Sequence, residues 1–188
     1  VIDYVLLPTY DDVTEVVATS ADHTILLTAL QTAGLVTTLQ DMSADFTVFA
    51  PTDAAFGQFL SDAGISAADL LADPNLAKIL LHHVVSGTVL STSLSNGEVT
   101  TISGLDVTVD VSSGAKIDSA NVVVADILAD NGVVHALDYV LLPTYDDVTE
   151  VVATSPDHTI LLLALQTAGL VATLQDLSAD FTVFAPTD

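Results

Sequence analysis

Cysteine, tryptophan and arginine are all absent from this sequence of 188 residues. The absence of cysteine excludes a disulfide framework and any thiol chemistry. Long apolar runs are also missing, and none approaches the ~20 residues that a membrane-spanning helix requires. We therefore expect a chain that does not insert into a membrane and that folds without covalent cross-links.

Positive charge is almost absent, because Lys78 and Lys116 are the two basic residues against 25 acidic ones. All of the acids except Glu15, Glu98 and Glu150 are aspartates, and the net charge is −23. Such a surface repels phosphates, so nucleic acids and anionic lipids are poor partners.

Two interpretations of the acidity are open. The aspartates could form a solvated coat suited to saline surroundings, where the Debye length at ~0.5 M salt is only a few Å. Alternatively, some carboxylates could form a calcium site, since they are hard oxygen ligands. No Asp-x-Asp-x-Asp-Gly loop occurs in the sequence. We therefore assign no metal ligand and no cofactor, and expect at most nonspecific association of Ca²⁺ with the acidic surface.

Apolar residues make up 51% of the chain, whereas charged residues make up 14%. This composition excludes intrinsic disorder, which requires low hydrophobicity and abundant charge. A chain of this length can bury about two thirds of the surface that it exposes when unfolded. A folded domain with a substantial core is expected.

A long internal repeat dominates the organisation of the sequence. Residues 1–53 recur as residues 136–188 at an offset of 135, and 47 of the 53 positions are identical. A period of this length is the size of a whole domain and far exceeds a solenoid unit. The six differing pairs are Val1/Ala136, Ile2/Leu137, Ala21/Pro156, Thr28/Leu163, Thr37/Ala172 and Met42/Leu177.

The repeat predicts three parts of a tandem array. Residues 1–8 are expected to be the last strand of a preceding domain, residues 9–143 a complete domain, and residues 144–188 the first part of a following one. The segment Val133–Leu142 is predicted to form a strand that ends at Pro143. Phe181–Ala185 is predicted to be a strand that pairs with a neighbouring molecule, because later strands of that copy are not in the sequence.

The apolar pattern changes from a helical to a strand period along the middle part. Val13, Val16 and Val17 share one helical face, and a second helical run ends at Gly34. Leu105–Val111 alternates strictly between apolar and polar residues, which is typical of a half-buried strand. Helices first and strands later predict an α+β domain with a sandwich-like or barrel-like sheet.

Three motifs occur in order within residues 9–143: Thr47–Phe56, His82–Gly87 and Asn131–Pro143. Together they resemble the motifs of fasciclin-type domains, and the resemblance covers the whole copy. It implies a fasciclin-like α+β fold, with short N-terminal helices packed on a sandwich-like or barrel-like sheet. His82 stands where the family usually has tyrosine, so we do not expect the receptor contact that such a hydroxyl would make.

The resemblance also suggests where a partner binds. In fasciclin-type adhesion domains an Asp-Ile dipeptide near the closing motif is linked to attachment, and Asp126–Ile127 matches it. The alternative is structural, with Ile127 in the core and Asp126 bonded to a turn. His82 and His83 of the central motif are further binding candidates, although a hydrogen-bonded core histidine also explains His83.

Other motif residues are interpreted as architecture. Phe49 lies in a short strand that ends at Pro51, and Thr52 and Asp53 are placed to cap the next helix. His135 and Asp138 belong to the closing motif, and their spacing on a strand would point them apart.

The leading functional hypothesis is an extracellular adhesion module, secreted or attached to a cell surface. The alternative is a structural repeat unit of an extracellular filament, stalk or sheath assembled head to tail. The expected partners are neighbouring copies of the chain and a cell-surface or matrix protein or glycan. Motifs of hydrolases and phosphate-binding loops are absent from the sequence, so we expect no enzyme activity.

Overall fold

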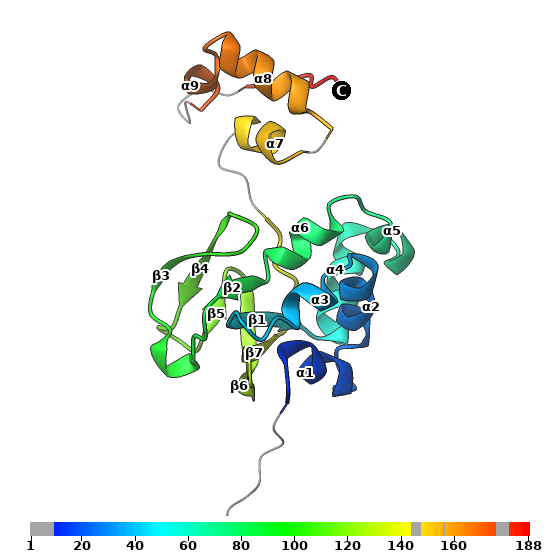
Figure 1. Ribbon diagram of the computed structural model, residues 1–188, viewed down its shortest axis with the longest axis vertical. Helices are drawn as coiled ribbons and strands as arrows, with labels where there is room; N and C mark the ends of the chain where they lie inside the picture. Colours follow the sequence, from blue (N-terminus) through cyan, green and yellow to red (C-terminus); the bar gives the residue numbers. More distant parts are fainter. Residues whose placement is uncertain (1–9, 144–147, 156, 176–180) are drawn as a thin grey trace, which may run out of the picture. The chain divides into compact units, whose positions relative to one another are not determined.

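A computed structural model describes residues 10–143, 148–155, 157–175 and 181–188. The chain divides into two compact units, Val1–Pro143 and Thr144–Asp188, which are considered separately. Figure 1 shows the first unit as a group of helices beside a sheet. The predicted α+β class is confirmed, whereas the assignment of residues 1–8, 9–143 and 144–188 to three successive domains stays a prediction, and residues 1–9 lie outside the described residues.

The first unit contains six α-helices and seven strands among its described residues. The helices are α1 (Val13–Thr19), α2 (Thr24–Thr32), α3 (Val36–Leu39), α4 (Asp53–Ala63), α5 (Ala67–Leu71) and α6 (Leu76–Leu81). The strands are β1 (Phe46–Pro51), β2 (Val84–Ser86), β3 (Gly97–Thr100), β4 (Asp106–Asp110), β5 (Lys116–Ile117), β6 (Ala120–Ala129) and β7 (Gly132–Leu137).

The helix ends follow from local signals in the sequence. The Asp12 carboxylate accepts hydrogen bonds from the backbone of Thr14 and Glu15, so it caps α1. Gly34 has φ +69°, which lets the chain turn back and bond to the last carbonyls of α2. At the start of α4 the prediction needs a correction, because Thr52 alone is the capping residue.

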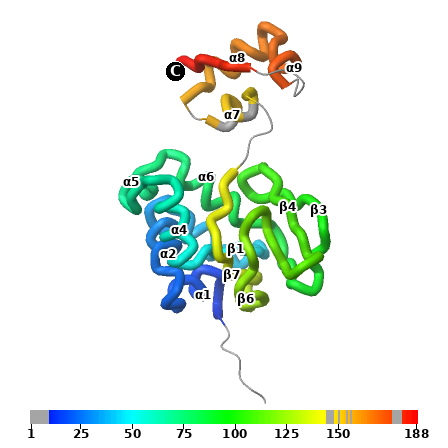
Figure 2. Tube along the Cα trace, turned by 180° about the vertical axis from the view of Figure 1, so that it is seen from behind, coloured from blue at the N-terminus to red at the C-terminus, as the bar shows by residue number. Residues whose placement is uncertain are grey.

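The seven strands form one sheet in the order β2-β1-β7-β6-β5-β4-β3. β1 runs parallel to β7, whereas the other neighbouring pairs are antiparallel. Figure 2 shows β1, β7 and β6 in the middle of the unit, with helices on one side and β3 and β4 on the other. Every residue of β1 and β7 is buried, because both faces of these central strands are covered.

Two hydrophobic clusters lie on opposite faces of the central strands. Phe46, Val48 and Ala50 of β1 pack with helix residues and with Val134 of β7. Phe49 of β1 packs on the other side, in a cluster that also contains residues of β4, β5 and β7. The sheet therefore folds over itself, which agrees with the predicted sandwich-like or barrel-like sheet. Val107 and Val109 supply the buried face that the alternation of β4 predicts.

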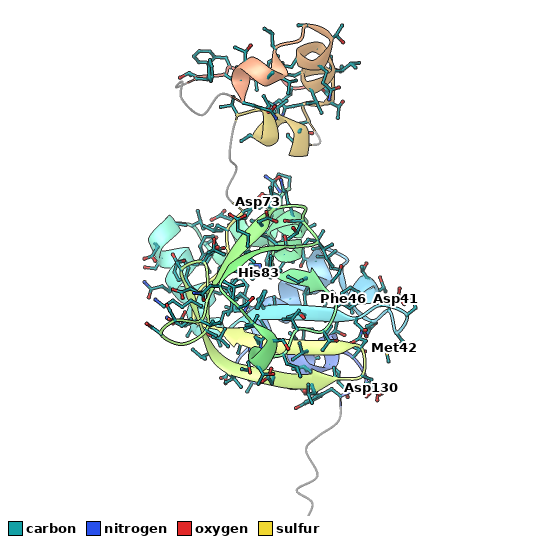
Figure 3. All side chains as sticks on the ribbon, turned by 90° about the vertical axis from the view of Figure 1, so that its left-hand side faces the viewer. Asp41, Met42, Phe46, Asp73, His83 and Asp130 are labelled. Carbon is teal, nitrogen blue, oxygen red and sulfur yellow. The ribbon has the colours of Figure 1, made fainter. Side chains whose placement is uncertain are left out.

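The two-residue turn between β6 and β7 joins the helices to the sheet. Asn131 is buried, donates a hydrogen bond to the Leu39 carbonyl (2.7 Å) and accepts one from the Val13 amide (2.8 Å). Its carbonyl accepts from the Phe46 amide at the start of β1. Figure 3 shows Asp41, Met42 and Asp130 at this edge of the unit.

Gly132 follows this turn and could not be any other residue without rearrangement. Its φ is +151°, and a Cβ added there would lie 1.9 Å from the Phe46 carbonyl oxygen. Because Phe46 and Gly132 are register partners, the clash would fall on the parallel pair at the centre of the sheet.

The predicted strand over Val133–Leu142 is wrong in its second half. β7 ends at Leu137, and no strand covers the described residues 138–143. The reason is that this backbone makes single hydrogen bonds, one to a side chain and one to a carbonyl group, instead of pairing along a strand. The Leu141 amide donates to His83 Nε2 (2.9 Å), while the Asp138 amide donates to the Asn121 carbonyl (3.1 Å).

The second unit repeats the first three helices at the same offset of 135 residues. They are α7 (Val148–Thr154), α8 (Thr159–Thr167) and α9 (Val171–Leu174). Residues 181–188 form no strand within the chain and Phe184 is 92% exposed, whereas the predicted pairing of Phe181–Ala185 with a neighbouring molecule stays a prediction. Strand pairing requires a row of backbone partners, and the described residues of this unit provide none.

Candidate functional site

His83 is a structural residue buried between α6 and β2. Its Nδ1 donates to the Ile79 carbonyl (2.8 Å), and its Nε2 accepts from the Leu141 amide (2.9 Å). These two bonds require a neutral ring with its proton on Nδ1. Burial lowers the pKa of His83 to about 4, which favours the same neutral form. Both ring nitrogens of His83 are therefore engaged inside the unit, and the structure gives no support to the binding role predicted for this residue.

His82 caps the C-terminus of α6 and is also fully buried. Its Nδ1 lies 3.1 Å from Ser103 Oγ and 3.3 Å from Thr101 Oγ1. Nε2 has no hydrogen-bond partner among the described residues. Burial lowers the pKa of His82, and the nearby Asp118 carboxylate opposes part of this effect.

His135 links β7 to the loop before Ser91. Its Nε2 donates to the Val89 carbonyl (2.9 Å), and its Nδ1 accepts from the Asp126 amide (3.2 Å). The ring stacks on Phe49, with centroids 5.8 Å apart and an interplanar angle of 27°. His135 and Phe49, which were predicted to be structural, thus support one another inside the sheet.

Asp126 occupies a bulge of β6 with φ +61°, a conformation that aspartate tolerates better than most residues. Its carboxylate accepts from the Ser91 amide (2.7 Å) and from the Ser91 hydroxyl. Partial burial raises the pKa of Asp126, but the hydrogen bonds from Ser91 together lower it by more, so the pKa lies below its usual range. Ile127 is half-buried and packs against the main core. The contacts of Asp126 and Ile127 are therefore those of structural residues, with Asp126 bonded to the Ser91 loop and Ile127 packed on the core.

Large apolar side chains near Asp126 are nevertheless exposed. On β6, Val123, Val124 and Leu128 are 52%, 51% and 53% exposed, and Leu90, next to Ser91, is 37% exposed. These four residues are called the β6 patch below. One edge of β6 pairs with β7. Along the other edge, β5 pairs with Ala120 and Asn121 and Tyr10 bridges to Ala129, and between these points no strand of the described residues pairs with β6. The patch therefore combines apolar side chains with an open sheet edge.

The remaining motif residues fix the architecture. Pro51 ends β1, and Asp53 binds the start of α2 by accepting from Thr24 Oγ1 (2.6 Å) and from the Ile25 amide (2.8 Å). Asp138 lies beyond β7, where it binds Asn121 rather than His135. As expected, His135 and Asp138 are not partners.

Sequence reasoning missed Ser91 and underestimated Asn131. Nothing near Ser91 in the sequence indicates that Asp126, 35 residues away, binds it. Asn131 could have been found, because an Asn-Gly pair between two apolar runs is a strong signal of a hairpin.

Among the described residues, no group of three or more metal-ligating side chains comes together. Every helix of the described part is too short or too polar to span a membrane.

Comparison with known proteins identifies the family. The family model described as "Fasciclin domain" matches residues 21–143, which is more than half of the chain. The chain therefore belongs to the fasciclin domain family.

Relatives of the chain include bacterial proteins. "Protein sll1483" of Synechocystis is 38% identical over 134 residues, covering 70% of this chain and 73% of the relative. The "Cell surface glycolipoprotein MPB83" of Mycobacterium bovis is 34% identical over 138 residues, covering 68% of this chain and 60% of its own length. A solved pair of FAS1 domains from the insect cell adhesion molecule fasciclin I is 20% identical, with a TM-score of 0.43 over 86% of this chain and 56% of that one.

Proposed function

We propose that this chain is a non-catalytic, extracellular adhesion module that contacts its partner through the β6 patch. The family supports an adhesion-type module, and a relative named for its cell-surface location supports an extracellular setting. The polar residues of the motifs are occupied by internal contacts, so they serve to hold the surface in place. His135 and Asp126 fix β6, and the Ser91 loop lies against it.

The observation that carries this proposal is the exposure of Val123, Val124 and Leu128 on one short stretch of β6. Exposed apolar groups that adjoin an unpaired sheet edge are costly in water unless a partner covers them. This stretch includes one acid, Asp126, whose charge is already bonded to Ser91. It therefore avoids much of the repulsion that the net charge of −23 imposes on contacts elsewhere.

A second candidate function is a structural repeat unit of a filament, stalk or sheath. The observation that favours it is the identity of 47 of 53 residues between the two copies, which share the same three helices. In this case the partner of the β6 patch would be a further copy of the chain.

The test uses beads coated with the 188-residue chain on three films: collagen, cellulose and the chain itself. Adhesion predicts saturable binding to collagen or cellulose, and the structural alternative predicts binding to the film of the chain alone. The informative variant is Val123→Thr/Val124→Thr, which keeps the branched shape but makes the patch polar. Val111→Thr is the matched control, because Val111 is 38% exposed and lies outside the patch.

The double variant is expected to reduce bead retention by at least about tenfold, since two apolar contacts at about 0.7 kcal/mol or more each are lost. Val111→Thr is expected to leave retention unchanged. Equal retention by the double variant and the control would contradict the role of the β6 patch. Retention on none of the films would contradict both candidate functions.

A further inference from the structure

A second surface feature lies at the start of β6, and none of the four residues of the β6 patch lines it. It is a pocket of about 480 Å³ lined by Gln58, Ser119, Asn121, Asp138 and Tyr139. These residues come from α4, from the turn before β6, and from the start of β6 and the end of β7. A helix and the ends of two strands thus meet at one shallow, open depression, with a volume in the usual range of small-molecule sites.

The floor of this pocket is rigid because Asn121 and Asp138 bind each other three times. The Asn121 amide donates to Asp138 Oδ1 (2.7 Å), and Asn121 Nδ2 donates to Asp138 Oδ2 (2.6 Å). The Asp138 amide donates to the Asn121 carbonyl (3.1 Å). Tyr139 is held as well, because its hydroxyl donates to Asp62 Oδ2 (3.0 Å). Such preorganisation lowers the entropic cost of binding a ligand.

Several polar atoms of the lining remain available. Ser119 Oγ, Asn121 Oδ1 and Gln58 Oε1 make no hydrogen bond within the described part of the chain. Asn121 Nδ2 and Gln58 Nε2 each carry a second hydrogen beyond the bonds already named. The pocket therefore offers both donors and acceptors at short spacing beside an aromatic ring.

We propose that this pocket binds a neutral carbohydrate. Vicinal hydroxyl groups each donate and accept, which matches the mixed amide, hydroxyl and carboxylate lining. The tyrosine ring offers an apolar surface to the C–H groups of a sugar. Anionic sugars and phosphates are disfavoured, because Asp138 and Asp62 lie at the site and the chain carries a charge of −23. A cation is disfavoured because both carboxylates are already engaged by donors.

The test is a titration of the ¹⁵N-labelled 188-residue chain followed by NMR. The probes are cellobiose, lactose and mannobiose at up to about 50 mM, which is sufficient for a millimolar Kd. 6′-Sialyllactose serves as the anionic comparison and CaCl₂ as the cationic one. At least one neutral disaccharide is expected to shift the amide signals of Ser119, Asn121 and Tyr139, whereas sialyllactose and calcium leave them in place.

Two exposed lining residues can be changed without touching the core, Gln58→Ala and Ser119→Ala. Each is expected to weaken the affinity about three- to tenfold through the loss of a hydrogen bond. Gln31→Ala is the matched control, because Gln31 is an exposed glutamine on α2. This variant is expected to bind the disaccharide with the same affinity as the unaltered chain. The absence of shifts with all three disaccharides would overturn the proposal, and so would shifts that neither variant weakens. Neither result decides the role of the β6 patch, because Val123 and Val124 do not line the pocket and are tested by a separate assay.

Discussion

Phe49 and Phe184 occupy equivalent positions in the two copies of the repeat, yet Phe49 is 2% exposed and Phe184 is 92% exposed. The six residues Phe46–Pro51 form the buried strand β1. The identical residues 181–186 form no strand. The same short sequence thus adopts two states within one chain.

The helical parts of the two copies agree, in contrast. α7, α8 and α9 have the same bounds as α1, α2 and α3 at the offset of 135, although Leu163 replaces Thr28 in α8 and Ala172 replaces Thr37 in α9. Asp188 accepts from the amide of Ile160 at 2.8 Å, as Asp53 does from the amide of Ile25 at 2.8 Å. The backbone hydrogen bonds of a helix join residues four positions apart, and the aspartate contact, although its partners are 28 positions apart, uses residues that both copies contain. The helices and this contact therefore form in both copies.

The difference shows what a strand of this fold requires. β1 pairs with β2 and β7, whose residues come from distant parts of the first unit. Strand propensity is context-dependent, and Phe-Thr-Val-Phe-Ala-Pro becomes a strand only where partners are supplied. The following predictions test this contrast between local and long-range control.

The largest effect is expected for Gly132→Ala, which disrupts the partner strand of β1. The new Cβ would meet the Phe46 carbonyl at 1.9 Å, so the parallel pair must separate. We expect the free energy of unfolding of the first unit to fall by more than about 4 kcal/mol, measured by urea denaturation. Gly57→Ala in α4 is the control: its Cβ meets open space, and it should raise stability by up to about 1 kcal/mol. A similar small effect of both variants would contradict this account of the central pair.

Phe49→Ala and Phe184→Ala compare the same substitution in the two copies. Removal of the buried ring, which also stacks on His135, should cost about 3–5 kcal/mol of unfolding free energy. Removal of the exposed ring should change stability by less than about 0.5 kcal/mol. Thermal and urea unfolding of both variants would measure this, and equal losses would show that Phe184 is buried in solution.

Acid should destabilise the first unit before its carboxylates are protonated. His83 has a pKa of about 4 when folded and near 6.5 when unfolded, so between these values only the unfolded chain takes up the proton. Stability is therefore complete above pH 6.5 and falls by about 3 kcal/mol as the pH falls towards 4. Burial also lowers the pKa of His23 and His82, which adds in the same direction.

The measurement is the urea midpoint between pH 7 and pH 4.5. His83→Gln, which keeps a donor and an acceptor but does not titrate in this range, should reduce the slope. A midpoint that is constant or rises on acidification would refute the neutral buried ring.

The smallest effect is expected for Asp53→Asn and Asp188→Asn, because each variant weakens one contact between residues 28 positions apart that both copies contain. Each variant weakens the hydrogen bonds that the carboxylate accepts at the start of α2 or α8, at a cost of about 1 kcal/mol. Exchange of the Ile25 and Ile160 amides should accelerate about fivefold in the respective variant, as measured by NMR. An effect at Ile25 alone would show that this contact, too, depends on the rest of the first unit.

The contrast between local signals and long-range partners also explains which features could be predicted from the sequence. The cap at Asp12, the stop at Gly34 and the buried face of β4 were predictable, because their signals lie within a few residues. The pattern of Phe181–Ala185 also predicts a strand, but a pattern does not supply partners, and no strand forms there within the chain.

The candidate site was less predictable than the fold. The contact of Asp126 with Ser91 and that of His83 with Leu141 join residues 35 and 58 positions apart. No local pattern indicates either contact, and the parallel pairing of β1 with β7 is equally remote in sequence. The pocket at Asn121 and Tyr139 likewise arises only when β6, β7 and α4 come together.

Hydrogen exchange of the backbone amides tests the central claim most directly, on the 188-residue chain at a dilution where sedimentation shows a monomer. The amides of Val48 and Phe49 are predicted to be protected by more than about 100-fold, because they lie in a paired, buried strand. Those of Val183 and Phe184, in the same local sequence, are predicted to exchange at nearly the rate of an unfolded peptide. Similar protection of both pairs would contradict the conclusion that long-range partners, rather than local sequence, make this segment a strand.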